Sequence, residues 1–396
     1  MNLDKKMIKN NIPRIRFNNF EAFWVENRIA DIVKISAGGD VDKVKLKESG
    51  KYPVIANALT NKGIVGFYED YKVKAPAVTV TGRGDVGYAV ARHENFTPIV
   101  RLLTLQSEKI DVDYFENQIN SMRILNESTG VPQLTAPQLG NYKVYHPKIE
   151  EQSAIGILFR TLDDLLASYK DNLTNYQALK ATMLSKMFPK AGQTVPEIRL
   201  DGFDGEWEVQ SLKELASFSK GNGYTKSDLV NSGNEIILYG QLYTNYQTVI
   251  SMVNTFVLET REKSVISKGG EVVVPASGES AEDISRASVI EKSGVIIGGD
   301  LNIIYPDENK VDSIFLALTI SNGSQQKELI KRAQGKSVVH LRNNDLEKVV
   351  LHYPSMEEQQ AIGACFSNLD NLINSHQEKI SQLEILKKKL LQDMFI

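Results

Sequence analysis

A stretch of about forty residues occurs twice in this chain, and it limits the possible folds more than any other feature. Residues 147–188 and 354–395 align without a gap at an offset of 207, and 16 of the 41 positions after the shared proline are identical. Both copies begin Pro-x-x-Glu-Glu-Gln-x-Ala-Ile-Gly and end Met-Phe. This agreement predicts an internal duplication rather than two unrelated helices that look alike.

Each copy carries apolar residues at alternating spacings of four and three. The repeat includes Ile155, Leu162 and Leu166 in the first copy and Ile362, Leu369 and Ile373 in the second. A repeat sustained this long predicts a coiled-coil helix. The one polar member of the first repeat is Lys180, and Lys387 repeats this lysine in the second copy. A glycine one turn into each copy, Gly156 or Gly363, should weaken the helix by about 1 kcal/mol relative to alanine.

The two copies divide the chain into a repeated pattern of globular head and helix. We predict a first head at 1–146, a helix at 147–188, a linker at 189–195, a second head at 196–353 and a second helix at 354–396. A Pro-x-Ile-Arg box opens each head at Pro13 and Pro196, and the only two tryptophans, Trp24 and Trp207, follow it. We expect both tryptophans to pack in a core.

Within the heads, short β-branched runs punctuated by glycine predict an α+β fold whose heads are mixed and mainly β. Strands are expected at 51–55, 63–68, 77–81 and 86–90, and again at 235–239 and 269–274. Residues 294–301 and 303–305 are expected to form paired strands. Residues 113–124 are expected to be helical, as are the amphipathic segments 25–35 and 209–218.

Composition places the chain among ordinary globular proteins. With 396 residues, 42% of them hydrophobic and 24% charged, it can form two domains. No apolar run approaches the roughly 20 residues of a membrane span. Cys365 is the only cysteine, so no disulfide can form within the chain. We therefore expect a cytoplasmic protein without membrane contact.

No stretch of the sequence presents a credible catalytic or metal site. Gln334-Gly335-Lys336-Ser337 lacks the earlier glycine of a phosphate-binding loop. The glycines around Arg83 spell G-x-G-x-x-G, but strand-like residues follow them, so a glycine turn is the better interpretation. The five histidines lack metal-ligand spacing. An adenine methyltransferase motif is absent as well, and we predict neither a metal nor a cofactor bound by this chain.

Charge is distributed unevenly between the heads. Residues 1–146 have 20 basic and 16 acidic side chains, a net +4, whereas residues 189–353 have 17 and 22, a net −5. The net charge of the whole chain is −3. Binding to nucleic acid would therefore depend on local patches rather than on a general positive field.

The combination of these motifs resembles the specificity subunit of type I restriction–modification systems. The resemblance extends from about Pro13 to Phe395, and its most specific pieces are the duplicated Glu-Glu-Gln-x-Ala-Ile-Gly entry and the run Tyr-Gly-Gln-Leu-Tyr-Thr at 239–244. It implies two target recognition domains, each reading half of a split DNA sequence. It also implies two antiparallel helices that set the spacing between the heads.

The same resemblance implies a non-catalytic component of a larger complex. The partners would be double-stranded DNA, two methyltransferase (modification) subunits and restriction/translocase subunits. S-adenosylmethionine, ATP and Mg would be bound by those partner subunits. Independently, a head–helix–head–helix order with equal helices can fold into a pseudo-two-fold object with equivalent sites for two identical partners.

Candidate DNA contacts are polar residues in glycine-containing loops, where the backbone can approach DNA closely. In the first head they are Thr79, Thr81, Gly82, Arg83, Gly84 and Tyr88. In the second head they are Gln241, Tyr243, Thr244, Asn245, Tyr246, Ser277, Gly278 and Ser280. Arginine suits guanine, and glutamine and asparagine suit adenine. A solvated arginine at a hairpin tip is the competing interpretation for Arg83.

Candidate partner contacts lie at the start of each long helix. They are Glu150, Glu151, Gln152, Ile155, Leu162 and Leu166 in the first helix and Glu357, Glu358, Gln359, Ile362, Leu369 and Ile373 in the second. Two other classes of function stay open at this point. One is an adaptor with protein-binding heads, and the other is an enzyme whose site has no recognisable motif.

Overall fold

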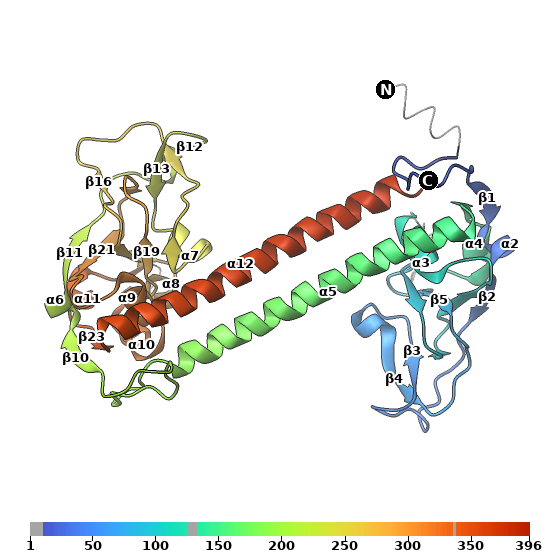
Figure 1. Cartoon of the computed structure of the whole chain (residues 1–396), viewed down its shortest axis with the longest axis horizontal. Coiled ribbons are helices and arrows are strands. Elements are labelled where there is room, and N and C mark those ends of the chain that lie inside the picture. Colours follow the sequence, from blue (N-terminus) through green and yellow to red (C-terminus); the bar gives the residue numbers. More distant parts are fainter. Residues whose placement is uncertain (1–10, 123, 125–132, 336–337) are drawn as a thin grey trace. The chain divides into compact units, whose positions relative to one another are not determined.

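The computed structural model describes residues 11–122, 124, 133–335 and 338–396 (Figure 1). Lys336 and Ser337 of the Gln-Gly-Lys-Ser stretch lie outside the described residues, as do 1–10, 123 and 125–132 of the first predicted head. The chain divides into two compact units. Unit 1 comprises Met1–Asp171 and Gln377–Ile396, and unit 2 comprises Asn172–His376. Each unit thus contains one head and a part of both long helices.

Unit 1 contains a four-stranded, a three-stranded and a two-stranded sheet. Its strands are β1 (Val25–Arg28), β2 (Lys34–Ala37), β3 (Tyr52–Ile55), β4 (Ile64–Tyr68), β5 (Ala77–Val80), β6 (Ala89–Arg92), β7 (Thr97–Pro98), β8 (Leu103–Gln106) and β9 (Lys143–His146). Its short helices are α2 (Ile29–Ile32), η1 (Thr60–Gly63), α3 (Val112–Ser121) and α4 (Ala136–Asn141). The sheet orders are β2-β8-β5-β6, β4-β3-β7 and β1-β9.

Unit 2 has a larger head. Its strands are β10 (Glu208–Ser211), β11 (Ala216–Lys220), β12 (Leu229–Val230), β13 (Asn234–Ile237), β14 (Val249–Ile250), β15 (Phe256–Val257), β16 (Val265–Ile266), β17 (Glu271–Pro275), β18 (Ser277–Gly278), β19 (Ser288–Ile290), β20 (Ile296–Ile297), β21 (Leu301–Pro306), β22 (Val339–His340) and β23 (Val350–Tyr353). Its short helices are α6 (Leu212–Leu215), η2 (Lys226–Asp228), α7 (Gln241–Thr244), α8 (Ala281–Ile284), α9 (Ser313–Ile320), α10 (Gly323–Arg332) and α11 (Asn343–Leu346).

The two heads share one strand layout, as the sequence predicts. The order β2-β8-β5-β6 in unit 1 matches β11-β21-β17-β19 in unit 2, where β14 extends the edge. A second sheet in unit 2 has the order β12-β15-β13-β20-β16. Strand pairs β1–β9 and β10–β23 join the beginning of each head to its end, and a tyrosine on the last strand donates to a glutamate on the first in both (Tyr145 to Glu26, 2.8 Å; Tyr353 to Glu208, 2.9 Å). The α+β class is therefore confirmed.

Two local predictions are wrong. Residues 25–35 and 209–218, expected as helices, form β1-α2-β2 and β10-α6-β11, in which only one short turn of helix separates two strands. Strands form at these positions because each pairs with a strand far along the chain. In unit 1, β1 pairs with β9 and β2 pairs with β8.

Residues 294–305 do contain β20 and β21, but these strands do not pair with each other. β20 pairs with β13 and β16, and β21 pairs with β11 and β17.

The long helices are α5 (Ile149–Lys186) and α12 (Met356–Asp393), 38 residues each. In unit 1 the first part of α5 lies beside the last part of α12, and in unit 2 the last part of α5 lies beside the first part of α12 (Figure 1). Ion pairs between Asp163 and Lys387 and between Lys170 and Glu384 show that the helices are antiparallel within unit 1. The predicted seam residues Ile155, Leu162, Leu166, Ile362 and Leu369 are buried, and Ile373 is half-buried.

Each unit has a core of four packed aromatic rings. In unit 1 the rings are Trp24, Tyr114, Phe159 and Phe395, with centroids 5.5 to 6.1 Å apart. In unit 2 they are Trp207, Phe315, Phe366 and Phe188, with centroids 5.6 to 6.2 Å apart. Both tryptophans are at most 2% exposed, so their predicted role in the core is confirmed. The Met-Phe ends of the duplicated stretch thus contribute a methionine and a phenylalanine to each core.

Candidate nucleic-acid interface and the junctions that hold it

Each head is fastened to the start of a long helix by a buried arginine–glutamate pair. In unit 1 the Arg16 guanidinium donates two hydrogen bonds of 2.7 Å to the Glu151 carboxylate. In unit 2 Arg199 donates bonds of 2.8 and 2.6 Å to Glu358. The glutamate side chains are only 3% and 2% exposed. Two parallel charge-assisted bonds fix both distance and orientation, so the pairs hold each head in one position on its helix.

A glutamine beside each glutamate forms a second link. In unit 1 the Gln152 side chain accepts from the Asp111 backbone N–H at 3.0 Å and donates to the Pro147 carbonyl at 3.0 Å. In unit 2 Gln359 accepts from the Asp312 N–H at 2.9 Å and donates to the Pro354 carbonyl at 2.9 Å. The shared proline and glutamine of the duplicated stretch therefore belong to one hydrogen-bonded connection.

The same connection includes the first turn of a helix in each head. Asp111 caps α3 by accepting from the Tyr114 N–H, and Asp312 caps α9 by accepting from the Phe315 N–H. These caps make Tyr114 of the first head the structural equivalent of Phe315 of the second. Capping aspartates satisfy N–H groups that a helix leaves unpaired at its start.

The glycines of the duplicated stretch lie against these capping aspartates, but Gly156 packs against its cap more closely than Gly363 does. A Cβ added at Gly156 would lie 2.6 Å from Asp111 Oδ1 and 2.9 Å from the Tyr114 nitrogen. At Gly363 the nearest atom, Asp312 Oδ1, would be 3.4 Å away. Glycine is therefore required sterically in the first helix, whereas the second has room for a methyl group.

Alanine at these two glycines should have opposite effects. Gly156→Ala should destabilise unit 1 by about 1–3 kcal/mol, because the methyl group overlaps the cap of α3. Gly363→Ala should stabilise unit 2 by up to about 1 kcal/mol, since alanine favours the helix and its methyl group would meet its neighbours at ordinary contact distances of 3.4 Å. Urea unfolding of each variant against the unchanged chain measures both free energies. Equal changes of the same sign would contradict this structure of the junctions.

The two lysines of the seams are paired across the long helices. Lys180 binds Asp370 within unit 2, and Lys387 binds Asp163 within unit 1. Asp163 and Asp370 are related by the same offset of 207 as the lysines. Lysine in an apolar seam is costly when unpaired, and a polar seam residue with one partner favours a single register. The repeated polar position thus has a structural reason that periodicity does not reveal.

The predicted partner contacts are largely buried inside the chain. Glu151, Gln152, Glu358 and Gln359 are at most 2% exposed and form the junctions, and Ile155 and Ile362 belong to the two cores. Glu150 and Glu357 are exposed on the same turns of the two helices. A role in binding partners stays a prediction for the whole set, and Glu150 and Glu357 are its accessible members.

In the first head, the candidate DNA contacts lie around the turn after β5. Thr79 is 1% exposed, and its hydroxyl accepts from Arg92 Nε and donates to the Val90 carbonyl, so it supports the sheet in this conformation. Thr81 and Gly82 are buried as well. Gly84 and Tyr88 are exposed and Arg83 is half-buried, and among the described residues the Arg83 guanidinium has no ion-pair partner. The outward-facing part of this set is thus Arg83, Gly84 and Tyr88.

In the second head, the candidates fall into two groups. Gln241, Tyr243, Thr244, Asn245 and Tyr246 lie on and just after α7. Both ends of the Gln241 amide are occupied, by the Leu238 N–H and the Thr255 hydroxyl, whereas Thr244 and Asn245 are exposed. Ser277, Gly278 and Ser280 form the other group. Ser277 and Gly278 are buried in β18, and Ser280 caps α8. Base contacts by any of these residues stay predictions.

A half-buried carboxyl group, Glu116, lies on α3 of the first head. Burial, together with the nearby carboxylates of Asp163 and Asp113, raises the pKa of Glu116 to about 6, although a hydrogen bond from the Ala91 backbone and the charge of Lys387 oppose the shift. Because the folded pKa exceeds the unfolded value, the folded state binds this proton more tightly. Glu116 therefore costs stability above pH 6, and this cost disappears as the pH falls towards 4.5.

Glu116→Gln should remove this cost. The variant should be more stable than the unchanged chain by about 1 kcal/mol at pH 7.5, allowing for partial solvent exposure, and equally stable at pH 4.5. The measurement is the free energy of urea unfolding at both pH values. Glu94→Gln, at an exposed position, is the matched control and should show no such dependence. A benefit of Glu116→Gln that does not change with pH would refute the assignment.

The arginines of the junctions are the residues that sequence reasoning missed. Arg16 and Arg199 belong to the repeated Pro-x-Ile-Arg box, but their partners lie 135 and 159 residues away. The signal available in the sequence is that both boxes contain an arginine and both long helices contain a glutamate at matching positions.

Among the described residues, no three His, Cys, Asp or Glu side chains are grouped to hold a metal, and no helix is long and apolar enough to cross a membrane.

The comparisons with known proteins agree with this duplicated arrangement. The family model "Type I restriction modification DNA specificity domain" matches residues 22–180 and 204–385. The type I restriction enzyme MjaVIII specificity subunit of Methanocaldococcus jannaschii is 22% identical over 399 residues, which covers 93% of this chain and 91% of that protein. The S subunit of a type I restriction–modification system from M. genitalium shares the fold, with a TM-score of 0.66 at 15% identity over 97% of this chain and 99% of that one. Since the family model covers both heads with their helices, the chain belongs to the type I restriction–modification DNA specificity family.

Proposed function

We propose that this chain is the component that selects the DNA sequence in a type I restriction–modification complex, and that each head reads one half of a two-part target. The two long helices would set the spacing between the half-sites and dock two methyltransferase (modification) subunits. Methyl transfer from S-adenosylmethionine, and the chemistry of ATP and Mg, would belong to partner subunits.

The observation that carries this proposal is the repeated junction. The same arginine–glutamate pair, glutamine link and capping aspartate occur once in each unit, whereas the loops of the two heads differ in residues and length. Identical anchoring with different surfaces suits two readers of different half-sites, because the anchoring fixes position while the loops vary. Two equivalent helix starts would also suit two copies of one partner.

The charge of the heads suggests how affinity is divided. Residues 189–353, the second head with its linker, have a net charge of −5, so contacts to DNA phosphates would be few and local in this head. Much of the affinity that does not depend on sequence would then come from the partner subunits. Tight binding of DNA by the isolated chain, with a steep dependence on salt, would overturn this division.

Genome-wide mapping of N6-methyladenine tests the proposal directly. A host without related systems would express this chain with the methyltransferase subunit encoded beside it, and control cells would lack this chain. New methylation at one two-part motif, seen only with this chain, is the expected result. If the partner is expressed and bound but no motif appears, the heads do not select DNA.

Charge reversal at Arg83 separates a DNA reader from a protein-binding adaptor. In a reader, Arg83→Glu should abolish or relax recognition of one half-site and leave the other unchanged, because the second head is untouched. Lys109→Glu makes the same charge change at an exposed turn of unit 1 and should leave the motif unaltered. An adaptor would be indifferent to both substitutions.

A further inference from the structure

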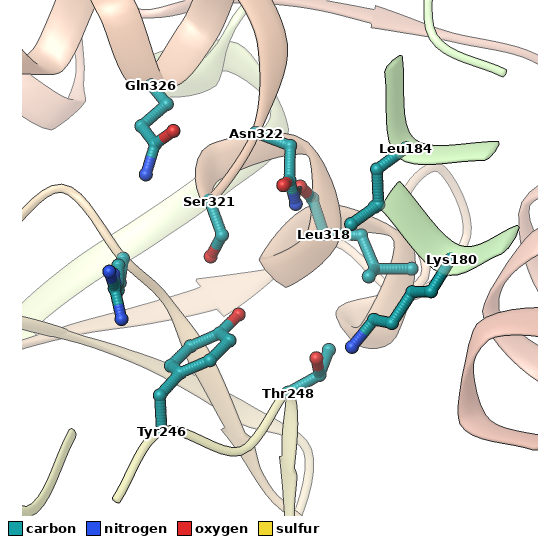
Figure 2. A pocket seen from close by; sticks show the side chains of 9 residues that line it. Lys180, Leu184, Tyr246, Thr248, Leu318, Ser321, Asn322 and Gln326 are labelled. Carbon is teal, nitrogen blue, oxygen red and sulfur yellow. Dashed lines mark hydrogen bonds between the residues drawn. The ribbon is translucent and has the colours of Figure 1, made fainter. Parts of the chain in front are cut away.

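A cavity of about 260 Å³ lies within unit 2, where the last part of α5 meets the second head (Figure 2). Its lining residues are Lys180, Leu184, Tyr246, Thr248, Arg286, Leu318, Ser321, Asn322 and Gln326. Figure 2 shows the polar ends of Lys180, Tyr246, Thr248 and Ser321 directed into one space. Two cations and no carboxylate line it, so its walls favour a negatively charged occupant.

The two cations of the cavity differ in their partners. Lys180 is paired with Asp370, whose carboxylate also accepts from the Thr248 hydroxyl at 3.4 Å. Among the described residues, Arg286 has no carboxylate partner, and its guanidinium lies 5.5 Å from the centre of the Tyr246 ring. One positive charge therefore remains uncompensated at the cavity.

Hydrogen-bonding groups surround this charge. Ser321 is 6% exposed, Thr248 is 5% exposed, and Tyr246 donates to the Ala287 carbonyl at 3.2 Å. Asn322 is the N-cap of the ten-residue helix α10, but its side chain makes no cap bond to the first turn. Unpaired N–H groups at a helix start favour anions, so α10 adds to the positive character that the arginine already provides.

The corresponding place in unit 1 has a different character. Asn120 of α3 bonds to the backbone N–H and carbonyl of Ala89, and Ser321 bonds to those of Ala287 in the same way. These matched bonds make Tyr88 the equivalent of Arg286. Tyr88 lies near the carboxylates of Glu116 and Asp163, which raise its pKa together with burial. At the position of Arg286 the first head therefore has a tyrosine beside two carboxylates instead of an arginine.

We propose that this cavity binds a phosphate group through Arg286, either a phosphodiester of the DNA backbone or a free phosphate. Its volume equals that of about nine waters at roughly 30 Å³ each, which is room for one phosphate group and a few waters. A guanidinium offers paired N–H donors that match phosphate oxygens. The inference does not depend on the proposed function, because binding of inorganic phosphate needs neither a target sequence nor a partner subunit.

The full chain can be titrated with inorganic phosphate and with a short DNA duplex at constant ionic strength set by sodium chloride. Arg286→Gln is the test variant. Arg261→Gln is its matched control, because Arg261 also stacks on a tyrosine (4.3 Å from the Tyr224 ring centre) but is paired with Asp228. We expect Arg286→Gln to weaken binding at least about tenfold, as for one lost charge-assisted bond, and Arg261→Gln to leave it unchanged. Arg286→Lys keeps the charge and should retain part of the binding.

The pattern of losses identifies the source of the phosphate. A loss seen with inorganic phosphate assigns a free anion, and a loss seen only with the duplex assigns the DNA backbone. The proposal is overturned if neither probe depends on Arg286. Equal weakening by Arg286→Gln and Arg261→Gln would also overturn it, because it would reflect net charge alone. Circular dichroism and thermal unfolding verify that each variant is folded.

Discussion

Glu151→Ala should destabilise unit 1 by about 3–5 kcal/mol. The substitution leaves the Arg16 guanidinium without its carboxylate in a place where water cannot replace it, and removing one partner of a buried pair has costs of this size. It also removes the acceptor of the Trp24 indole N–H, which lies 3.3 Å from the Glu151 carboxylate. The measurement is urea unfolding followed by the fluorescence of Trp24 in a Trp207→Phe background.

The control for this prediction is an exposed pair in the same unit. Glu69 binds Lys47 at 3.1 Å, and their side chains are 66% and 58% exposed. Glu69→Ala should change stability by less than about 0.5 kcal/mol, since exposed pairs contribute little. A loss below about 1 kcal/mol for Glu151→Ala would show that the junction does not hold the first head.

Phe188→Ala should destabilise unit 2 by about 3–5 kcal/mol, the usual cost of removing a buried ring. Phe188 is 7% exposed and packs against Trp207, Phe315 and Phe366, so its loss leaves a cavity in the centre of the core. Urea unfolding followed by Trp207 fluorescence in a Trp24→Phe background measures the change. The expected midpoint shift is large because the four rings pack as one cluster.

A matched substitution on α5, which ends two residues before Phe188, separates this effect from a general loss of helix stability. Leu179 lies in the unit 2 part of α5 and is 47% exposed. Leu179→Ala should shift the free energy of unfolding by less than about 0.5 kcal/mol. Similar losses for the two variants would indicate that the end of α5 is not anchored in the core of the second head.

Both predictions concern contacts that join the long helices to the heads. The long helices are also the part of the fold that the sequence predicts best. The bounds of α5 and α12 lie within two residues of the predicted 147–188 and close to 354–396. The reason is physical: helix hydrogen bonds connect residues four apart, so a heptad repeat is visible in any short window. The seam lysines were visible in the same way.

The sequence pattern predicts helix at 25–35 and 209–218 because nothing nearby in the sequence indicates the partners of the strands that form there. β1 pairs with β9 more than a hundred residues later, and such pairing overrides a weak local preference. The buried state of Thr79 and the occupied amide of Gln241 were hidden for the same reason. Loop residues that look available in a sequence can be used by the sheet beneath them.

The duplicated stretch determined the order of heads and helices, the long helices and the family resemblance, because these depend on local periodicity and on repetition along the chain. Only the tertiary structure decided which residues fasten the heads, that Gly156 is sterically required while Gly363 is not, and that Arg286 faces a cavity without a carboxylate. Each of these depends on atoms brought together from distant segments. Their energies arise from burial and from exclusion of water, which a linear pattern does not record.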